Sequence, residues 1–224
     1  AEADDVIHPN RVLARHLALR YPGARVYVLG EAALQEELRR AGVHLVPDPP
    51  AAVPAGQAGE PPAATAYDPG VDVVVASFDR TLTYAKLNRA HQALRRGAVL
   101  LATNPDPTCP VEGGDIPDCG ALLAALEACS GVRPAWIAGK PGPAILEAAL
   151  ERLGTPPDRT LVVGDRLETD MAMARRAGMP CALVLTGVTD ARRLQTAPPE
   201  LRPDLVLPSV AALLPAAGLR PAAP

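Results

Sequence analysis

Lys140, Asp165 and Asp170 are charged residues placed where predicted strands give way to helices. Lys140 ends the segment "AWIAGK" (135–140), Asp165 follows the apolar run "TLVVG" (160–164), and Asp170 comes five residues later. The carboxyl ends of parallel strands meet at one edge of a sheet, where ligands bind. We therefore expect Lys140 and Asp165 to converge at that edge.

These residue types suit a phosphorylated ligand together with a hard cation. Mg²⁺ is usually held by one or two carboxylates, waters and phosphate oxygens, so Asp165 is a candidate ligand. Lys140 would neutralise a phosphoryl group, and residues 166–169 would offer backbone N–H groups at a helix N-terminus. Each feature also has a structural explanation, as a helix cap, a turn or a first-turn acid. In the functional interpretation, Asp170 orients Lys140 or a metal-bound water.

Apolar runs of strand length alternate with helix-period segments, which predicts an α/β fold on a mostly parallel sheet. Residues 47–70 are rich in Pro, Ala and Gly, and are predicted to form a surface insertion without regular structure. Strands are predicted at 24–30, 43–47, 71–78, 98–104, 135–140, 160–165 and 181–187. Helices are predicted at 31–42, 83–97, 119–131, 141–154 and from Asp165 to near Gly178, with a last strand and helix within 204–214.

The composition argues against several classes of protein. A chain of 224 residues with 48% hydrophobic residues can form one large α/β domain or two modest ones. A net charge of -3 and 3% aromatic residues give no reason to expect nucleic-acid binding. No apolar run reaches the roughly 18 residues of a membrane span, and no secretory signal is evident, so we expect a soluble cytoplasmic protein. The cysteines lack metal-site spacing and are predicted to lie in the core.

Several segments resemble the haloacid dehalogenase (HAD) superfamily. In the second half of the chain these are "GKPGP" (139–143), "VVGDRLETD" (162–170), "AGM" (177–179) and "LVLTGVT" (183–189). Residues 26–31, 100–114 and 119–131 are similar to the α/β cap of its NagD-like, 4-nitrophenylphosphatase and phosphoglycolate phosphatase branch. The resemblance covers nearly the whole chain except residues 47–70. Two departures are Gly142, where the family usually has Ser, and "PDCGA" (117–121), where it has P-G-A-G-A.

The resemblance implies a Mg²⁺-dependent phosphatase of small phosphorylated metabolites that works through an aspartyl-phosphate. Lys140 would be the third-motif lysine, Asp165 the metal-binding acid of the fourth motif, and Asp170 its second acid. The phosphate would also meet Arg166, Leu167, Glu168 and Thr169, and the cap would present Thr103, Asn104 and Asp106 to the substrate.

The resemblance also implies a domain division. Residues 1–24 would be a partial core segment, residues 25–131 an inserted α/β cap, and residues 132–224 the C-terminal part of an incomplete HAD-like, Rossmann-like core. The mechanism needs a nucleophilic Asp with a second Asp two residues later, and the sequence contains no such pair. Because the chain begins at Ala1 without Met, we expect a C-terminal portion of a longer phosphatase with little turnover of its own.

One alternative nucleophile is Asp79, which ends the strand-like run "VVVASFD" (73–79) and is followed by a candidate second-motif residue, Thr103. Position 81 is Thr rather than the acid/base Asp, and the flanking residues match the cap, so Asp79 is otherwise explained as a cap for the helix that starts near Thr83. A second alternative is a non-catalytic pseudoenzyme that binds phosphorylated metabolites. An incomplete core sheet would also leave an edge open to homodimer formation.

Overall fold

The computed structural model describes residues 2, 5–49 and 70–213. Most of the predicted insertion, residues 50–69, and the end of the last predicted helix therefore lie outside the described residues. Contacts within the chain divide it into two units, Ala1–Gly139 and Lys140–Pro224. Each unit has its own core and is described separately.

The first unit is built on a five-stranded parallel sheet in the order β2-β1-β3-β4-β7. Its central strands are buried along their length, because helices cover both faces, which explains their continuous Val, Leu and Ala runs. The strands are β1 (Arg25–Leu29), β2 (His44–Val46), β3 (Val73–Ala76), β4 (Val99–Ala102) and β7 (Trp136–Ile137).

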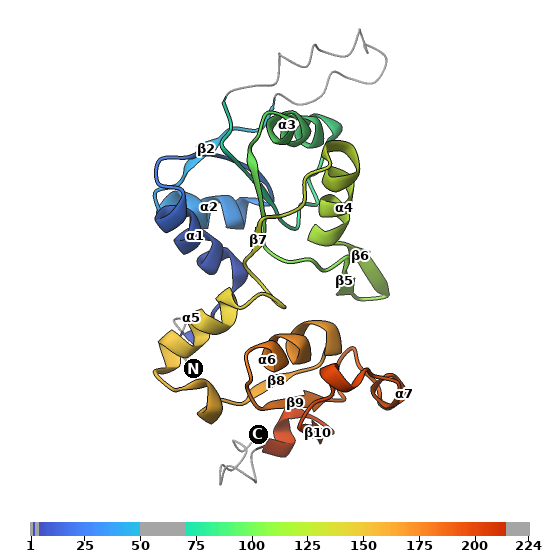
Figure 1. Ribbon diagram of the computed structural model, residues 1–224. Helices are drawn as coiled ribbons and strands as arrows, with labels where there is room; N and C mark the ends of the chain where they lie inside the picture. The colour runs from blue at the N-terminus through green and yellow to red at the C-terminus, as the bar shows by residue number, and fades with distance from the viewer. Residues whose placement is uncertain (1, 3–4, 50–69, 214–224) are drawn as a thin grey trace. The chain divides into compact units, whose positions relative to one another are not determined.

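Figure 1 shows helices α1 (Pro9–Arg20) and α2 (Ala32–Arg40) on one side of this sheet and α3 (Tyr84–Arg95) and α4 (Cys119–Ser130) on the other. The sequence marks the start of both helices on the second side. The Thr83 side chain accepts the Lys86 N–H at the start of α3, and the Asp118 side chain accepts the Cys119 N–H at the start of α4. A short antiparallel hairpin, β5 (Thr108–Val111) and β6 (Gly114–Pro117), precedes α4 and was not predicted.

The second unit contains a smaller parallel sheet in the order β10-β9-β8. Its hydrophobic core is formed mainly by Leu146, Leu167, Met171, Met179 and Leu183. The strands are β8 (Val162–Gly164), β9 (Cys181–Val184) and β10 (Leu205–Leu207). The helices are α5 (Ala144–Leu153), α6 (Ala172–Arg176) and α7 (Ala191–Gln195), with a π-helical turn, η4 (Leu167–Met171), and the 3₁₀ turns η3 (Pro157–Arg159), η5 (Pro199–Leu201) and η6 (Val210–Ala212).

Contacts at its two ends define the extent of the first unit. Helix α1, which includes most of residues 9–24, contacts α2 and lies in the first unit. Strand β7 pairs with β4, so residues 132–139 also belong to the first unit, and the second unit begins at Lys140. The division into a partial core segment, a cap and a C-terminal core part stays a prediction.

Two local predictions also need correction. The helix predicted from Asp165 to near Gly178 is a π-helical turn, η4, followed by the short helix α6. Cys119 and Cys181 are buried as predicted, but Cys129 is exposed and Cys109 only partly buried.

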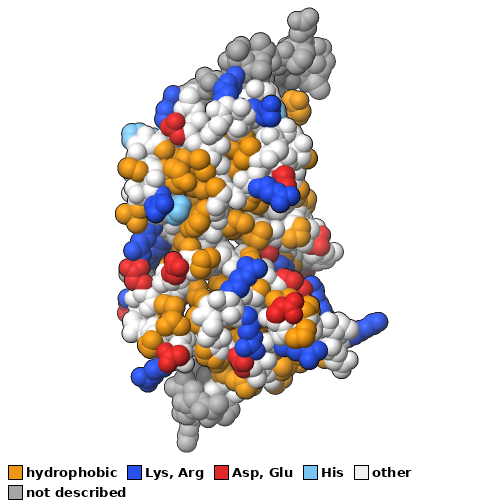
Figure 2. Space-filling view, in the orientation of Figure 1, with side chains coloured by type: hydrophobic (Ala, Val, Ile, Leu, Met, Phe, Trp, Pro, Cys, Tyr) orange, Lys and Arg blue, Asp and Glu red, His pale blue; other side chains and the backbone are white. Residues whose placement is uncertain are grey.

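Among the described residues, no helix has the length and apolar character needed to cross a membrane. Figure 2 shows Lys and Arg side chains interspersed with Asp and Glu side chains over the visible face of the molecule.

Candidate functional site

The three residues singled out in the second half of the sequence come together in the second unit. The ammonium of Lys140, the first residue after the boundary, donates a hydrogen bond of 2.6 Å to Oδ1 of Asp170. The Asp170 side chain is 6% exposed and that of Lys140 is 45% exposed. The buried carboxylate of Asp170 therefore pairs with the Lys140 ammonium, and the Lys140 side chain is partly exposed to solvent.

The second oxygen of Asp170 reaches the end of β8. Oδ2 of Asp170 accepts the N–H groups of Asp165, at 3.2 Å, and of Arg166, at 3.1 Å. This close approach requires Gly164, because a β-carbon at that position would overlap the Asp170 side chain. One carboxylate therefore connects Lys140 to the backbone of the predicted metal ligand.

The Asp165 side chain is held by the loop that follows β9. Its Oδ2 accepts the N–H of Val188 at 2.8 Å, and its backbone carbonyl accepts the N–H of Thr189 at 3.1 Å. Asp165 is partly buried. Residues 183–189 carry part of the family resemblance, but their contact with Asp165 was not predicted from the sequence.

The four residues predicted to bind phosphate, Arg166 to Thr169, differ in their burial and in their bonding partners. The N–H of Arg166 is bonded to Asp170, and the Leu167 side chain is 2% exposed within the core of the second unit. Glu168 is exposed and pairs with Arg193 at 2.7 Å. Burial opposes ionisation of Glu168, but hydrogen bonds from the backbone and Arg193 outweigh it and lower the pKa of Glu168 below 4.5. Thr169 is buried.

The predicted substrate-side residues Thr103, Asn104 and Asp106 all lie in the first unit, after β4. The Thr103 hydroxyl donates to the Ser77 hydroxyl at 3.0 Å, and the side-chain oxygen of Asn104 accepts the N–H of Asp106 at 2.9 Å. Thr103 and Asn104 also line a cavity of about 420 Å³ that includes His8. These residues therefore form one loop, with part of it open to a cavity.

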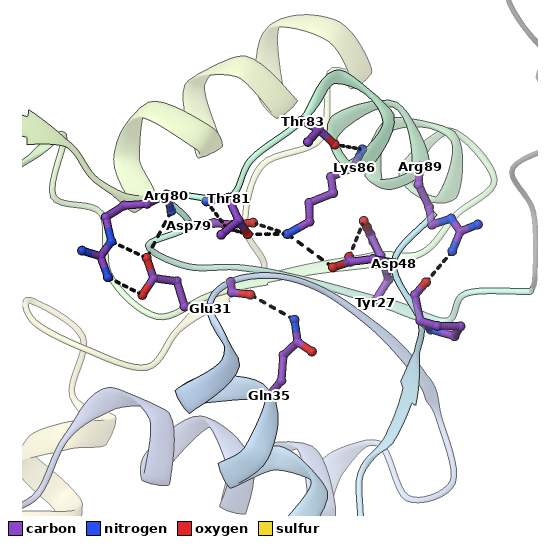
Figure 3. A network of polar contacts seen from close by, with 12 residues as sticks. Tyr27, Glu31, Gln35, Asp48, Asp79, Arg80, Thr81, Thr83, Lys86 and Arg89 are labelled. Carbon is purple, nitrogen blue, oxygen red and sulfur yellow. Dashed lines mark hydrogen bonds and ion pairs between the residues drawn. The ribbon is translucent and has the colours of Figure 1, made fainter. Parts of the chain in front are cut away.

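Asp79, the alternative nucleophile, lies in the first unit inside a network of polar contacts (Figure 3). Its side chain is 0% exposed, and Oδ2 pairs with the Lys86 ammonium at 3.1 Å. Oδ1 accepts the Thr81 N–H at 2.9 Å and the Thr81 hydroxyl at 2.6 Å. The helix cap predicted for Asp79 is provided by Thr83 instead. Both oxygens of Asp79 are thus already bonded.

Lys86 is the centre of this network. Its ammonium also contacts Asp48 Oδ2 at 3.3 Å and donates to the Thr81 hydroxyl at 2.7 Å. Asp48 in turn accepts the Tyr27 hydroxyl at 3.2 Å. Burial, and secondarily the Asp48 charge, raises the pKa of Tyr27.

The donor set at Asp165 fits an open magnesium site. Within residues 2, 5–49 and 70–213, no three His, Cys, Asp or Glu side chains are grouped so that they could hold a metal ion by themselves. Mg²⁺ does not need such a group, since it is usually bound by one or two carboxylates together with waters and phosphate oxygens. The partly buried Asp165 carboxylate, fixed by Val188 and adjacent to the Lys140–Asp170 pair, meets that requirement.

Comparisons with known proteins identify the family of this chain. A family model described as HAD-hydrolase-like matches residues 137–213. Glycerol-3-phosphate phosphatase from Gallus gallus is 41% identical over 206 residues, which is 87% of this chain and 65% of that protein. Ribonucleotide monophosphatase NagD from Escherichia coli is 32% identical over 209 residues, 93% of this chain and 72% of that protein.

A solved structure adds a match in three dimensions. Glycerol phosphate phosphatase from Mycobacterium tuberculosis, in complex with magnesium, superposes with a TM-score of 0.80 at 34% identity, over 95% of this chain and 59% of that chain. The present chain thus spans 59% of that protein and 65% of the chicken protein. By its 32% identity over most of NagD and the family-model match, this chain belongs to the HAD-like hydrolase family, in the branch that contains NagD.

Proposed function

We propose that this chain provides the magnesium- and phosphate-binding part of a phosphatase that hydrolyses phosphate monoesters of small metabolites through an aspartyl-phosphate. The observation that carries the proposal is the Asp170 carboxylate, which bonds Lys140 through one oxygen and the Asp165 N–H through the other. The similar proteins from Gallus gallus and Escherichia coli are both phosphatases, and the similar structure from Mycobacterium tuberculosis contains magnesium.

Each residue has a distinct role in this proposal. Asp165 would hold Mg²⁺, which supplies positive charge at the transferring phosphoryl group. Lys140 binds a phosphate oxygen through the exposed side of its ammonium, while Asp170 keeps that ammonium in place. The fixed geometry matters because donors that are already oriented stabilise developing charge without reorganising during the reaction.

The residues of the loop after β4 are proposed to contribute to substrate recognition as part of the predicted cap, residues 25–131. The cavity of about 420 Å³ lined by Thr103 and Asn104 supports this role. The uncharged hydroxyl and amide groups suit the hydroxyl-bearing part of a small metabolite rather than its phosphate.

Metal binding by the 224-residue chain tests this proposal directly. Mn²⁺, an oxygen-preferring substitute that can be followed by electron paramagnetic resonance, should bind at one site and be displaced by Mg²⁺. Asp165→Asn should abolish this binding because it removes the anionic ligand. Asp79→Asn should leave it unchanged, since Asp79 is enclosed by Lys86 and Thr81. Absence of Mn²⁺ binding to the native chain would contradict the proposal.

Hydrolysis of p-nitrophenyl phosphate separates the alternatives. No two aspartates in the sequence are spaced by a single residue, so we expect the chain to bind metal and orthophosphate with turnover near the buffer rate. Mg²⁺-dependent turnover that is lost in Asp79→Asn would identify Asp79 as the nucleophile and favour the alternative in which this chain is a compact HAD enzyme by itself. A protein that binds phosphorylated metabolites without the metal would favour the non-catalytic alternative.

A further inference from the structure

The loop between β9 and α7 lies so close to Asp165 that a side chain at Gly187 would overlap it. Two consecutive residues of this loop bond to Asp165: the Val188 N–H to the carboxylate at 2.8 Å, and the Thr189 N–H to the backbone carbonyl at 3.1 Å. The residue before them is Gly187, which is exposed. The loop therefore forms hydrogen bonds with both the backbone and the side chain of Asp165.

Gly187 is required at this point for space rather than for backbone conformation. Its φ is outside the positive range in which glycine is favoured, so alanine could adopt the same backbone. A β-carbon at Gly187, however, would overlap the β-carbon, carboxyl carbon and Oδ2 of Asp165. The three atoms nearest to such a β-carbon thus all belong to the side chain of Asp165, the proposed metal ligand.

We propose that Gly187 is a positioning residue for the metal site: by lacking a side chain, it lets the Val188 N–H reach the Asp165 carboxylate and fixes that carboxylate for the cation. This inference rests on the proposed function, because it assumes that Asp165 binds the metal. The bond from Val188 occupies Oδ2 and sets the orientation of the whole carboxylate, including Oδ1. Residues that orient a metal ligand in this way commonly change metal affinity about 10- to 100-fold when they are replaced.

The test uses the full 224-residue chain and the variant Gly187→Ala. Its matched control is Gly114→Ala, at an exposed glycine with open space around its β-carbon position and no positive φ. Titration with Mn²⁺ should show affinity reduced about tenfold or more in Gly187→Ala and unchanged in Gly114→Ala. Far-ultraviolet circular dichroism, which reports the backbone structure of both units, establishes that each variant is folded before titration.

A second readout does not depend on metal binding. Because the overlap involves the β-carbon of Asp165, the partner substitution must be Asp165→Gly; alanine would keep the clash. In the native background, Gly187→Ala should lower the Tm of the second unit by roughly 5 °C. In the Asp165→Gly background, the same substitution should lower it far less, since the overlapping side chain is gone.

The outcomes distinguish this inference from the function on which it rests. If the native chain binds no Mn²⁺, the proposed function fails, and the Tm cycle alone decides whether Gly187 positions Asp165. If the native chain binds Mn²⁺ and Gly187→Ala binds it equally well, the positioning role is wrong. An equal fall in Tm in both backgrounds would also overturn it, because the loop would then be disturbed for reasons unrelated to Asp165.

Discussion

The ammonium of Lys140 lies 2.6 Å from Oδ1 of Asp170, while Oδ2 of the same carboxylate accepts the N–H groups of Asp165 and Arg166. Asp170 thus joins residues from two places in the sequence, the segment before α5 and the end of β8. Its burial keeps water from competing for these bonds. The carboxylate is therefore a structural bridge within the site as well as a partner for the lysine.

Replacing Asp170 with Asn should weaken both sides of this bridge. The amide retains one acceptor oxygen but loses the charge, so either Lys140 or the two N–H groups lose their partner. We expect the free energy of unfolding of the second unit to fall by about 1–3 kcal/mol and orthophosphate affinity to fall about tenfold. Urea unfolding and phosphate titration measure the two effects.

The matched control is Glu200→Gln, at an exposed acid in the same unit. It makes the same chemical change at the surface and should alter the free energy of unfolding by no more than about 0.5 kcal/mol. Equal effects of the two substitutions would show that the buried bridge contributes little.

Lys86→Met should strongly destabilise the first unit. The substitution leaves the carboxylate of Asp79, which is 0% exposed, without its cation at 3.1 Å. Removing one partner of a buried ion pair typically costs about 3–5 kcal/mol, because the remaining charge stays buried. Urea unfolding followed by tryptophan fluorescence should report this loss, since Trp136 lies in the same unit.

The double variant Lys86→Met/Asp79→Asn provides the check on this explanation. It removes the buried charge along with its partner, so it should be more stable than Lys86→Met alone. If the double variant is the less stable of the two, the effect of Lys86→Met comes from lost packing or from Asp48 rather than from Asp79.

The pH dependence of stability should contain a contribution from Cys119. Burial is the main reason that the pKa of this thiol rises from 9.0 to about 11. Between these two values the unfolded chain loses the proton while the folded chain keeps it, so the free energy of unfolding falls as pH rises through this range. Below it, the contribution is fully present.

Cys119→Ala tests this contribution by removing the thiol. Urea midpoints measured from pH 8 upward should fall less steeply for Cys119→Ala than for the native chain, because the variant lacks the titrating group. Parallel slopes for the two proteins would mean that Cys119 does not titrate differently in the folded and unfolded states.

The α/β fold was predictable because its strands are buried on both faces. The apolar runs at 26–29 and 73–76 form most of β1 and all of β3 in the first sheet. The HAD resemblance is confirmed by the comparisons. The hairpin β5–β6 was missed because its strands are short and exposed and contain Pro110 and Pro117, although Gly113 with its positive φ marked the turn.

The residue types of the site were predictable, but their mutual contacts were not. Lys140 and Asp165 each follow a strand, and the rule for parallel sheets predicts that they converge. The two strands belong to different sheets, however, and it is the Asp170 carboxylate that connects the two residues. The π-helical turn η4 could not be predicted from the sequence, because it depends on burying Leu167 and Met171 while Asp170 contacts Lys140. The role of Gly187 could not be predicted either, because it depends on contact with Asp165, a residue far from it in sequence.

The separate hydrophobic cores affect how this protein unfolds on heating. One core lies wholly within the first unit and the other within the second, which has only three short strands. Such a chain has no single melting temperature, because each core can be lost at its own temperature. Since Lys140, Asp165 and Asp170 all belong to the smaller unit, metal binding should be lost on heating together with that unit, while the larger sheet is still intact.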